Sequence, residues 1–302
     1  MLTSALRHQC DNPEFLRRLN PPEQNSLWKN PGMVEDEALF GGSVANNYRE
    51  YLEPVIFRPW AELLVDFVGL NKDQTVLDIA AGTGVVSRAA AARIGPGSRV
   101  IAVDVSAAML AQVSNGFPSR EVTLQTLECS ATALELPDAS VDVVFCQQGL
   151  PFIPDRPGAA REMFRVLRPD GKVGIAVWLS TPRLEPFIIY GDALRAHHVP
   201  EPFQGAYESS ILGMTTDEMK SALDAAGFED VEVRVERLEV AWPSVLHAVR
   251  AASGTPYGPT IDAMDSDIRK SVLADVQRRM TGPSGKVTKH VMTSILARGR
   301  RP

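Results

Sequence analysis

The residues best suited to chemistry lie in segment 76–84, which reads VLDIAAGTG. A short apolar run ends there in two glycines, Gly82 and Gly84, and the helix-like sequence VVSRAAAARI follows directly. Glycines permit a tight turn and a close approach of the backbone to a ligand. A second apolar run, RVIAVD, ends at Asp104, twenty residues beyond Gly84. An acidic residue at this spacing binds ribose hydroxyls in nucleotide-binding βαβ units, so the pattern predicts a cofactor that contains a nucleoside.

The identity of that cofactor depends on the charges around the turn. A dinucleotide site favours a third glycine at position 87, where this chain has Ser87. It would also bring a pyrophosphate close to Asp78, and like charges disfavour that arrangement. S-adenosylmethionine has no phosphate and carries an ammonium and a sulfonium, which a carboxylate at the strand end favours. The other interpretation of Asp78 is a turn carboxylate that accepts hydrogen bonds from nearby N–H groups.

Alternating strand and helix patterns surround the glycine turn. Five apolar runs are typical of buried strands: TVLDIA, RVIAVD, EVTLQTLE, VDVVFCQ and KVGIAVW. The helices expected between them are VVSRAAAARI, SAAMLAQVSNGF with Ser106 as its N-cap, and residues 156–167. This alternation predicts an α/β fold with a parallel sheet that helices cover on both faces. Farther along, Thr216 is expected to cap a helix that stops at Gly227, and EDVEVRVERLEVAW and HVMTSILARG to be late strands.

The chain outside this core is expected to form a cap. Residues 1–60 are assigned to an N-terminal helical cap segment, and residues 61–302 to one α/β domain with cap insertions at about 180–213 and 243–287. Helical spacing in the first segment begins near Val44. Pro54 and Pro59 must bend or split that helix.

The composition excludes several classes of function. The 302 residues include 31 Lys and Arg against 37 Asp and Glu, a formal net charge of −6. This balance argues against a nucleic-acid partner, whose binding surface needs an excess of basic residues. No apolar run approaches the roughly 18 residues that a membrane span needs. Three cysteines are too few and too scattered for a disulfide framework or a zinc site, so we expect a reducing, cytoplasmic setting and no metal.

Four segments resemble the motifs of the class I S-adenosylmethionine-dependent methyltransferases, and more closely their ubiquinone/menaquinone-methyltransferase-like branch of small-molecule enzymes. VLDIAAGTG is similar to the first motif and IAVDVSAAML to the second. LPDASVDVVFCQQGLPFIPD is similar to the fourth-strand motif, and FRVLRPDGKVGIAVW to the motif before the fifth strand. The resemblance covers about residues 45–240. It implies a Rossmann-like methyltransferase fold, with a mostly parallel seven-stranded sheet, an antiparallel last strand and a helical cap.

The resemblance also implies a set of contacts with S-adenosylmethionine. One group would surround the methionine end of the cofactor: Asp78, Ala80, Gly82, Thr83 and Gly84. A second group would hold the ribose and the adenine: Asp104, Val105, Met109, Ser130 and Ala131. Ser130 stands where the family usually has an aspartate that reads the adenine amino group. Gln147 and Gln148 would face the methionine part and the transferring methyl group.

The acceptor is expected to be a small molecule. The end of the fourth strand reads CQQGLPF and lacks the Asn/Asp-Pro-Pro-Tyr pattern of enzymes that methylate amines of bases or glutamine. We therefore predict methyl transfer to O, N or C of a small, apolar or aromatic molecule of secondary metabolism, and we leave a homodimer open. Positioning and exclusion of water suffice for this in-line displacement unless the nucleophile must lose a proton.

Several side chains are candidates for the acceptor side of the site. The weak candidates for a base, or for closing over the cofactor, are His198, His197 and Tyr48. The aromatic candidates for an apolar pocket are Trp28, Phe40, Phe152, Phe187, Phe203 and Trp242.

Three alternatives stay open at this point. The same scaffold could carry a cyclase or decarboxylase that binds S-adenosylmethionine without transferring its methyl group. A binding module that has lost activity is disfavoured by the intact Asp78, Gly82, Gly84 and Asp104. An NAD-dependent oxidoreductase is disfavoured by Ser87 and Asp78.

Overall fold

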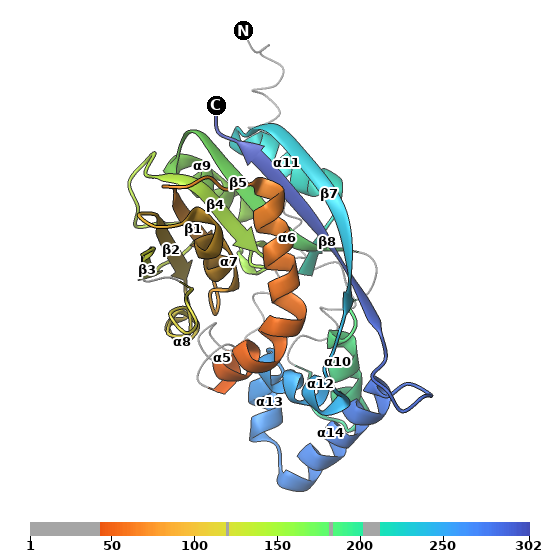
Figure 1. Ribbon diagram of the computed structural model, residues 1–302. Helices are drawn as coiled ribbons and strands as arrows, with labels where there is room; N and C mark the ends of the chain where they lie inside the picture. The colour runs from red at the N-terminus through yellow and green to blue at the C-terminus, as the bar shows by residue number, and fades with distance from the viewer. Residues whose placement is uncertain (1–42, 119–120, 181–183, 202–211) are drawn as a thin grey trace. The chain divides into compact units, whose positions relative to one another are not determined.

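The computed structural model describes residues 43–118, 121–180, 184–201 and 212–302 (Figure 1). Residues 1–42 of the expected N-terminal cap segment lie outside the described residues, and so do Trp28 and Phe40. The same holds for residues 202–211 of the first expected cap insertion, which include Phe203.

Within the described residues, eight strands form one sheet. They are β1 (Thr75–Ile79), β2 (Arg99–Asp104), β3 (Thr123–Glu128), β4 (Val141–Gln147), β5 (Leu167–Leu179), β6 (Gly213–Met214), β7 (Glu229–Val240) and β8 (His290–Arg300). Their order is β3-β2-β1-β4-β5-β8-β7, and the short β6 pairs with β5 off this path. Strands β1 to β5 pair in parallel, whereas β8 is antiparallel to both β5 and β7. The mostly parallel sheet with an antiparallel last strand is confirmed, and β6 is the strand beyond the expected seven.

Helices cover both faces of the sheet because the strands bury side chains in both directions. Val76 and Leu77 of β1 belong to different hydrophobic clusters, as do Val143 and Val144 of β4. On one face pack α6 (Arg58–Val68) and α7 (Val85–Ile94), and on the other α9 (Arg156–Val166) and α11 (Thr216–Ala226). None of the described helices combines the length and the apolar character that crossing a membrane requires.

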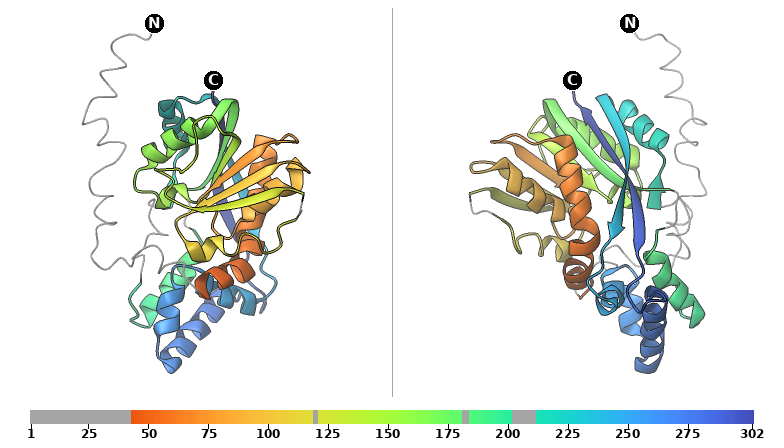
Figure 2. Two further views of the ribbon diagram at one scale, coloured as in Figure 1. Left: turned by 90° about the vertical axis from the view of Figure 1, so that its left-hand side faces the viewer. Right: turned by 45° about the vertical axis from the view of Figure 1, so that its right-hand side comes forward.

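A further group of helices gathers at the end of the sheet where the parallel strands finish. They are α5 (Ser43–Asn47), α10 (Phe187–Ala196), α12 (Val245–Ala251), α13 (Gly258–Ala263) and α14 (Ser266–Met280), with the short 3-10 turns η2 (Leu150–Phe152) and η4 (Ala252–Gly254) nearby. Figure 1 shows this group below the sheet, and both views of Figure 2 show the blue helices of residues 245–280 at the same end. Ligands of open α/β sheets bind at this end, where the parallel strands terminate.

The first described segment is helical throughout but changes its geometry at its prolines. After α5 comes a π-helix, η1 (Tyr48–Phe57), which contains Pro54, and Pro59 stands in the first turn of α6. Proline lacks the N–H that an α-helix needs and clashes with the carbonyl four residues back, so a regular α-helix cannot continue through Pro54. The prolines were expected to bend or split this helix, and the structure shows a change from π-helix to α-helix in a segment that stays helical.

The helix expected over SAAMLAQVSNGF is much shorter than its pattern indicates. It is α8 (Ala107–Leu110), and Ser106 caps it as expected by accepting a hydrogen bond from Met109 N–H at 3.3 Å. Gln112 and Val113 then donate to carbonyls three residues back instead of four, so the α-helix ends. This turn brings Val113 against Gly84, where an added Cβ would lie 2.6 Å from Val113 Cγ1. A tertiary contact thus overrides the local pattern.

The boundary of α11 also needs a correction of one residue. Its N-cap is Thr215 and not Thr216, because Thr215 and Glu218 satisfy each other's backbone N–H groups in a capping box. Gly227 ends the helix in the left-handed region with φ of 98°, as expected.

Gly174 of β5 marks the contact between α6 and the sheet. A Cβ there would lie 2.4 Å from Val68 Cγ2 and 2.9 Å from the ring of Phe145. We expect Gly174→Ala to lower the free energy of unfolding, measured by urea denaturation, by about 1–3 kcal/mol because the core is already filled. Gly282→Ala is the control, since the atom nearest to its added Cβ is 3.5 Å away. Equal stability of the two variants would contradict this packing.

Candidate functional site

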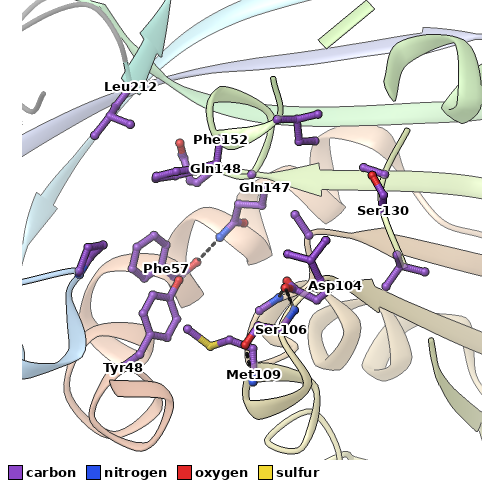
Figure 3. Close-up of a pocket in the computed structure, with 18 of the residues that line it drawn as sticks. Tyr48, Phe57, Asp104, Ser106, Met109, Ser130, Gln147, Gln148, Phe152 and Leu212 are labelled. Carbon is purple, nitrogen blue, oxygen red and sulfur yellow. Dashed lines mark hydrogen bonds between the residues drawn. The ribbon is translucent and has the colours of Figure 1, made fainter. Parts of the chain in front are cut away.

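A cavity of about 450 Å³ lies at the carboxyl ends of the parallel strands (Figure 3). This volume is within the range of roughly 300–1,000 Å³ typical of small-molecule sites. Its walls come from the turn after β1, the ends of β2 to β5, the helical segment η1 and the cap. Among the described lining residues the charged side chains are Asp104 and Asp155, with no lysine, arginine or histidine.

Asp104 holds together the turn after β1 and the end of β2. Its Oδ2 accepts a hydrogen bond from Gly82 N–H at 2.8 Å, and its Oδ1 accepts one from Ser106 N–H at 2.9 Å. Ala80 and Gly82 have φ of 53° and 54°, in the left-handed region, so the backbone turns sharply here. One carboxylate therefore fixes two of the loops to which the resemblance assigns cofactor contacts.

Asp78 does not line the cavity. Its side chain is buried, and Oδ2 accepts hydrogen bonds from the N–H and the hydroxyl of Ser87 at 2.9 and 2.6 Å. Burial raises the pKa of Asp78 to about 7, although the two bonds from Ser87 act in the opposite direction. These bonds fit the other interpretation of Asp78, a turn carboxylate that accepts hydrogen bonds from nearby groups, and its contact with the cofactor stays a prediction.

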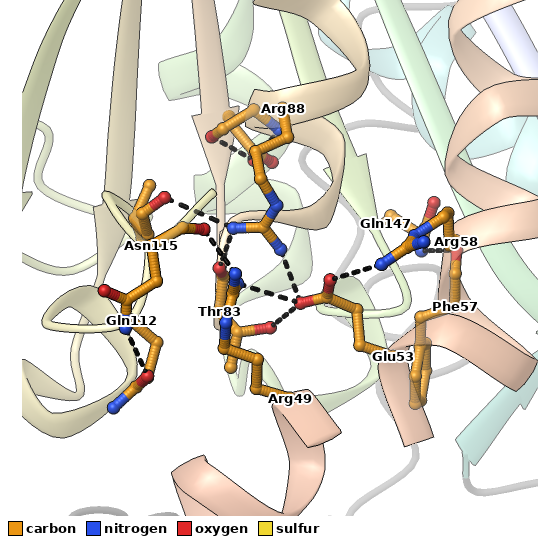
Figure 4. A network of polar contacts seen from close by, with 12 residues as sticks. Arg49, Glu53, Phe57, Arg58, Thr83, Arg88, Gln112, Asn115 and Gln147 are labelled. Carbon is orange, nitrogen blue, oxygen red and sulfur yellow. Dashed lines mark hydrogen bonds and ion pairs between the residues drawn. The ribbon is translucent and has the colours of Figure 1, made fainter. Parts of the chain in front are cut away.

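A buried network centred on Glu53 joins η1 to the turn after β1 (Figure 4). Glu53 is 1% exposed, accepts a hydrogen bond from Thr83 Oγ1 at 2.6 Å, and forms an ion pair with Arg88. Arg49 and Arg58 lie 3.7 and 3.6 Å from the same carboxylate. Sequence reasoning missed Glu53, although a lone acid in the apolar helical stretch YLEPVIF is a recognisable signal.

The structure brings together eight of the eleven predicted cofactor residues. The cavity is lined by Ala80, Gly82, Asp104, Val105, Met109, Ser130, Ala131 and Gln147. Like Asp78, Thr83 and Gly84 are not among the lining residues, because Thr83 bonds to Glu53 and Gly84 begins α7 with φ of 83°. The cofactor contacts themselves stay a prediction.

Two consecutive glutamines, the last residue of β4 and the residue after it, line the cavity. Gln147 Nε2 donates to the Phe57 carbonyl oxygen at 3.1 Å, and Gln148 Nε2 donates to Ser294 Oγ at 3.1 Å. Their exposed fractions are 9% and 6%. The Oε1 atoms of both side chains are buried without a hydrogen-bond partner in the described part of the chain.

Aromatic side chains line the part of the cavity that faces the cap. The rings of Tyr48 and Phe57 stack with centroids 4.8 Å apart, and Trp178 lies 6.2 Å from Phe57. Phe152 and Phe187, two aromatic residues that the sequence suggested, also line the cavity. This side of the site is therefore largely apolar.

The three candidates for a base or a closing residue lie in different places. Tyr48 lines the cavity, whereas His197 and His198 follow α10 and do not. His197 Nε2 lies 3.7 Å from Asp275 Oδ2 of α14, inside the cap. The geometry supports a site role only for Tyr48, and that role stays a prediction.

Other lining residues were not foreseen. Trp242, expected in the pocket, instead packs 5.9 Å from His247, whereas Phe57, Trp178 and Thr255 line the cavity. Trp178 could have been found from its place at the carboxyl end of the fifth strand. Phe57 and Thr255 carry no such signal, because only the tertiary fold brings their segments to the strand ends.

The cavity suits S-adenosylmethionine in charge and in hydrogen bonding. The carboxylates Asp104 and Asp155 favour a ligand that carries positive charge. Gln147 Oε1 lacks a donor, and an ammonium group would supply one. The backbone at Gly82 is open to a ligand, since no atom lies within 4 Å of the place where a Cβ would stand.

The chain is similar in sequence and in fold to known methyltransferases, which agrees with a cavity suited to S-adenosylmethionine. Residues 77–175 match the family described as methyltransferase domain. The chain is 30% identical over 189 residues to the ubiquinone/menaquinone biosynthesis C-methyltransferase UbiE of Enterobacter sp. (strain 638), a match covering 59% of this chain and 75% of that protein. The YcgJ protein of Bacillus subtilis shares the fold with a TM-score of 0.51 and 18% identity, over 80% of this chain and 97% of its own. The cyclase SpnF shares it with a TM-score of 0.52 and 18% identity, over 95% and 94%.

Burial makes Asp78 a source of pH-dependent stability. Its pKa is about 7 in the folded chain, against about 3.9 for an unperturbed aspartate, so the folded chain keeps a proton that the unfolded chain releases. The stability from this group is complete below about pH 4 and is lost as the pH rises through 7. We measure the Tm of the natural chain and of Asp78→Asn by scanning fluorimetry from about pH 5 to 8. As the pH rises over this range, the Tm of the natural chain should fall relative to that of Asp78→Asn.

The exposed Glu135 offers a matched control for this experiment. Glu135→Gln should keep the pH dependence of the natural chain, because it removes a carboxylate that is in water in both states. A constant Tm difference between the natural chain and Asp78→Asn would contradict the assignment.

Proposed function

The chain belongs to the class I S-adenosylmethionine-dependent methyltransferases of the UbiE type, and from this premise we propose that its acceptor is a small, apolar or aromatic molecule bound in the cavity beside the cofactor. The observation that carries the proposal is the division of the cavity. The predicted cofactor residues that line it lie at or just after the ends of β1 to β4, and the rest of the lining includes aromatic side chains of η1, η2, β5 and α10. A wall of this kind holds a flat or apolar group better than an extended polar polymer.

When bound, S-adenosylmethionine supplies an electrophilic methyl group, and as this carbon bonds to O, N or C of the acceptor the C–S electron pair stays on sulfur and S-adenosylhomocysteine forms. The chain's own contribution is to hold the acceptor and to keep water out. Side chains of η1, such as Leu52 and Phe57, close the cavity from one side, and Trp178 closes it from another. Holding two reactants in line lowers the barrier by up to about 7–11 kcal/mol without any acid or base. The methyl replaces one hydrogen of the acceptor, and the proton lost from its O–H, N–H or C–H is released to the bulk solvent when the product leaves the cavity.

The same fold also carries a non-methylating reaction, because SpnF is a cyclase. At 18% identity that likeness concerns the fold alone, whereas the relative at 30% identity is a C-methyltransferase. Methyl transfer is therefore the favoured reaction, and a cyclase is the second candidate.

We also propose a cytoplasmic setting. The two described cysteines, Cys129 and Cys146, are free, which fits a reducing compartment. The homodimer stays a prediction.

The reaction is tested by incubating the full chain with S-adenosylmethionine and a panel of neutral phenols, aromatic amines and quinols. Mass spectrometry should find S-adenosylhomocysteine in equal amounts with a product in which one methyl replaces one hydrogen. A product formed without S-adenosylhomocysteine would favour the cyclase. If S-adenosylmethionine fails to bind in calorimetric titration, the proposed function falls.

Asp104 offers a test of the cofactor side. In Asp104→Ala the turn after β1 loses the acceptor for Gly82 N–H, and the ribose loses its expected carboxylate partner. We expect the Kd for S-adenosylmethionine, measured by calorimetry, to rise at least tenfold, about 1.4 kcal/mol. An unchanged Kd in a variant with native circular dichroism would refute the ribose role.

A further inference from the structure

Gln148 presents a hydrogen-bond acceptor that the described fold leaves without a donor. The side chain lines the cavity and is more than nine-tenths buried, and its Oε1 has no partner in the described part of the chain. In Figure 3 Gln148 lies on the Leu212 side of Gln147, whereas Asp104 and Ser130 lie on the other side. A buried carbonyl oxygen without a donor is unfavourable, so a ligand that brings a donor gains affinity there.

Ser294 determines which way the amide of Gln148 faces. The Ser294 hydroxyl donates its one proton to a backbone carbonyl, that of Val177 at 2.7 Å. Toward Gln148 it can then act only as an acceptor, so the amide nitrogen faces Ser294 and the carbonyl oxygen is turned away from it. Contacts with Ser294 of β8, which is itself bonded to Val177 of β5, therefore fix the position of Gln148 Oε1.

The backbone holds Gln148 in place as well. Its φ is 56°, in the left-handed region that glutamine seldom adopts, and its N–H donates to the Ala176 carbonyl at 2.7 Å. The next residue, Gly149, packs on the turn after β1, because a Cβ there would lie 2.3 Å from Ala80 Cβ. Strained backbone of this kind persists where the surroundings enforce it and is frequent at functional sites.

Gln148 belongs to the acceptor side of the cavity. Strand β4 lies between β1 and β5, and the side chain of Gln148 bonds toward β8, away from the loops after β1, β2 and β3. Apolar side chains such as Trp178 and Leu212 line that side. The hydroxyl of Thr255, also in this wall, already donates to the Ala252 carbonyl at 2.6 Å and accepts from Tyr257 N–H at 3.1 Å.

The charges of the residues that line the cavity indicate which charge the acceptor carries. The described lining contains two carboxylates and no cationic side chain, so an anionic acceptor would lose its hydration without compensation. We propose that Gln148 is the specificity-determining residue of this site, and that its Oε1 accepts a hydrogen bond from a hydroxyl or ring N–H of a neutral aromatic acceptor. This inference rests on the proposed function and narrows its acceptor class.

The test compares three naphthalene probes on the full chain saturated with S-adenosylhomocysteine. 2-Naphthol carries a donor, 2-methoxynaphthalene lacks it, and 2-naphthoate is an anion. We expect calorimetry or competition to show 2-naphthol binding about tenfold more tightly than either of the other two, the effect of one hydrogen bond to a buried acceptor. Indole and 1-methylindole repeat the comparison for a ring N–H.

Two variants of Gln148 distinguish the effect of its side-chain carbonyl on binding from the effect of its left-handed backbone. Gln148→Leu removes the acceptor, and Gln148→Asn withdraws it by one methylene while tolerating the left-handed φ better. Both should lose the preference for 2-naphthol over 2-methoxynaphthalene. The affinity of each variant for S-adenosylhomocysteine is measured first, and the naphthalene probes are compared on variants saturated with it.

Ser294→Ala tests the positioning of the amide. Without the Ser294 hydroxyl the amide can turn its NH2 group toward the ligand, so 2-methoxynaphthalene should gain affinity relative to 2-naphthol. A purely structural role of Ser294 would shift both probes equally.

The outcomes separate this inference from the proposed function. If S-adenosylhomocysteine binds but 2-naphthol and indole show no advantage over their methylated partners, or if Gln148→Leu keeps that advantage, the role of Gln148 is overturned and methyl transfer stands. If the chain does not bind S-adenosylhomocysteine, the proposed function fails, and the inference fails with it.

Discussion

The site depends on the buried ion pair and hydrogen bond of the Glu53 carboxylate with Arg88 and Thr83. A charge this deeply buried is tolerated only when it is paired and hydrogen-bonded, and removing one partner of such a pair typically costs about 3–5 kcal/mol. Its partners, Thr83 and Arg88, belong to the turn after β1 and to α7, whereas Glu53 belongs to η1. The pairing therefore ties the helical wall of the cavity, with Phe57, to the glycine turn. Hydrophobic packing alone holds helices to a sheet but does not set their register this closely, because it is non-directional.

A second constraint acts where the central strands end. Ala80 and Gln148 both adopt left-handed backbone, which costs of the order of 1–3 kcal/mol per residue and persists only when neighbours enforce it. The absent side chain of Gly149 lets these two turns meet. The strain lies where the predicted cofactor side of the cavity joins its aromatic side. Ordered turns there fix the distance between two reactants, which is what an in-line displacement requires.

The core and the cap contribute differently to function. The fold of the core is shared with a protein of different activity, as the likeness to the cyclase SpnF shows. The walls that would select an acceptor come from η1, η2, α10 and the segment after η4, and they meet the core only at the strand ends. Within one family, substrates can therefore change through the cap while the cofactor side stays the same.

The sequence by itself determined the order of strands and helices along the chain, the glycine turn and the position of Asp104 at the end of β2, because these depend on local periodicity and on short, fixed spacings. It also placed the prolines at which the first helical segment changes its geometry. The tertiary structure alone decided that the Asp78 carboxylate bonds to Ser87 and does not line the cavity, and that Glu53 is a buried anchor. It alone decided the orientation of Gln148, which depends on a strand 146 residues away. Contacts between distant segments leave no periodic trace in a single sequence, since each partner satisfies its own local pattern equally well without the other.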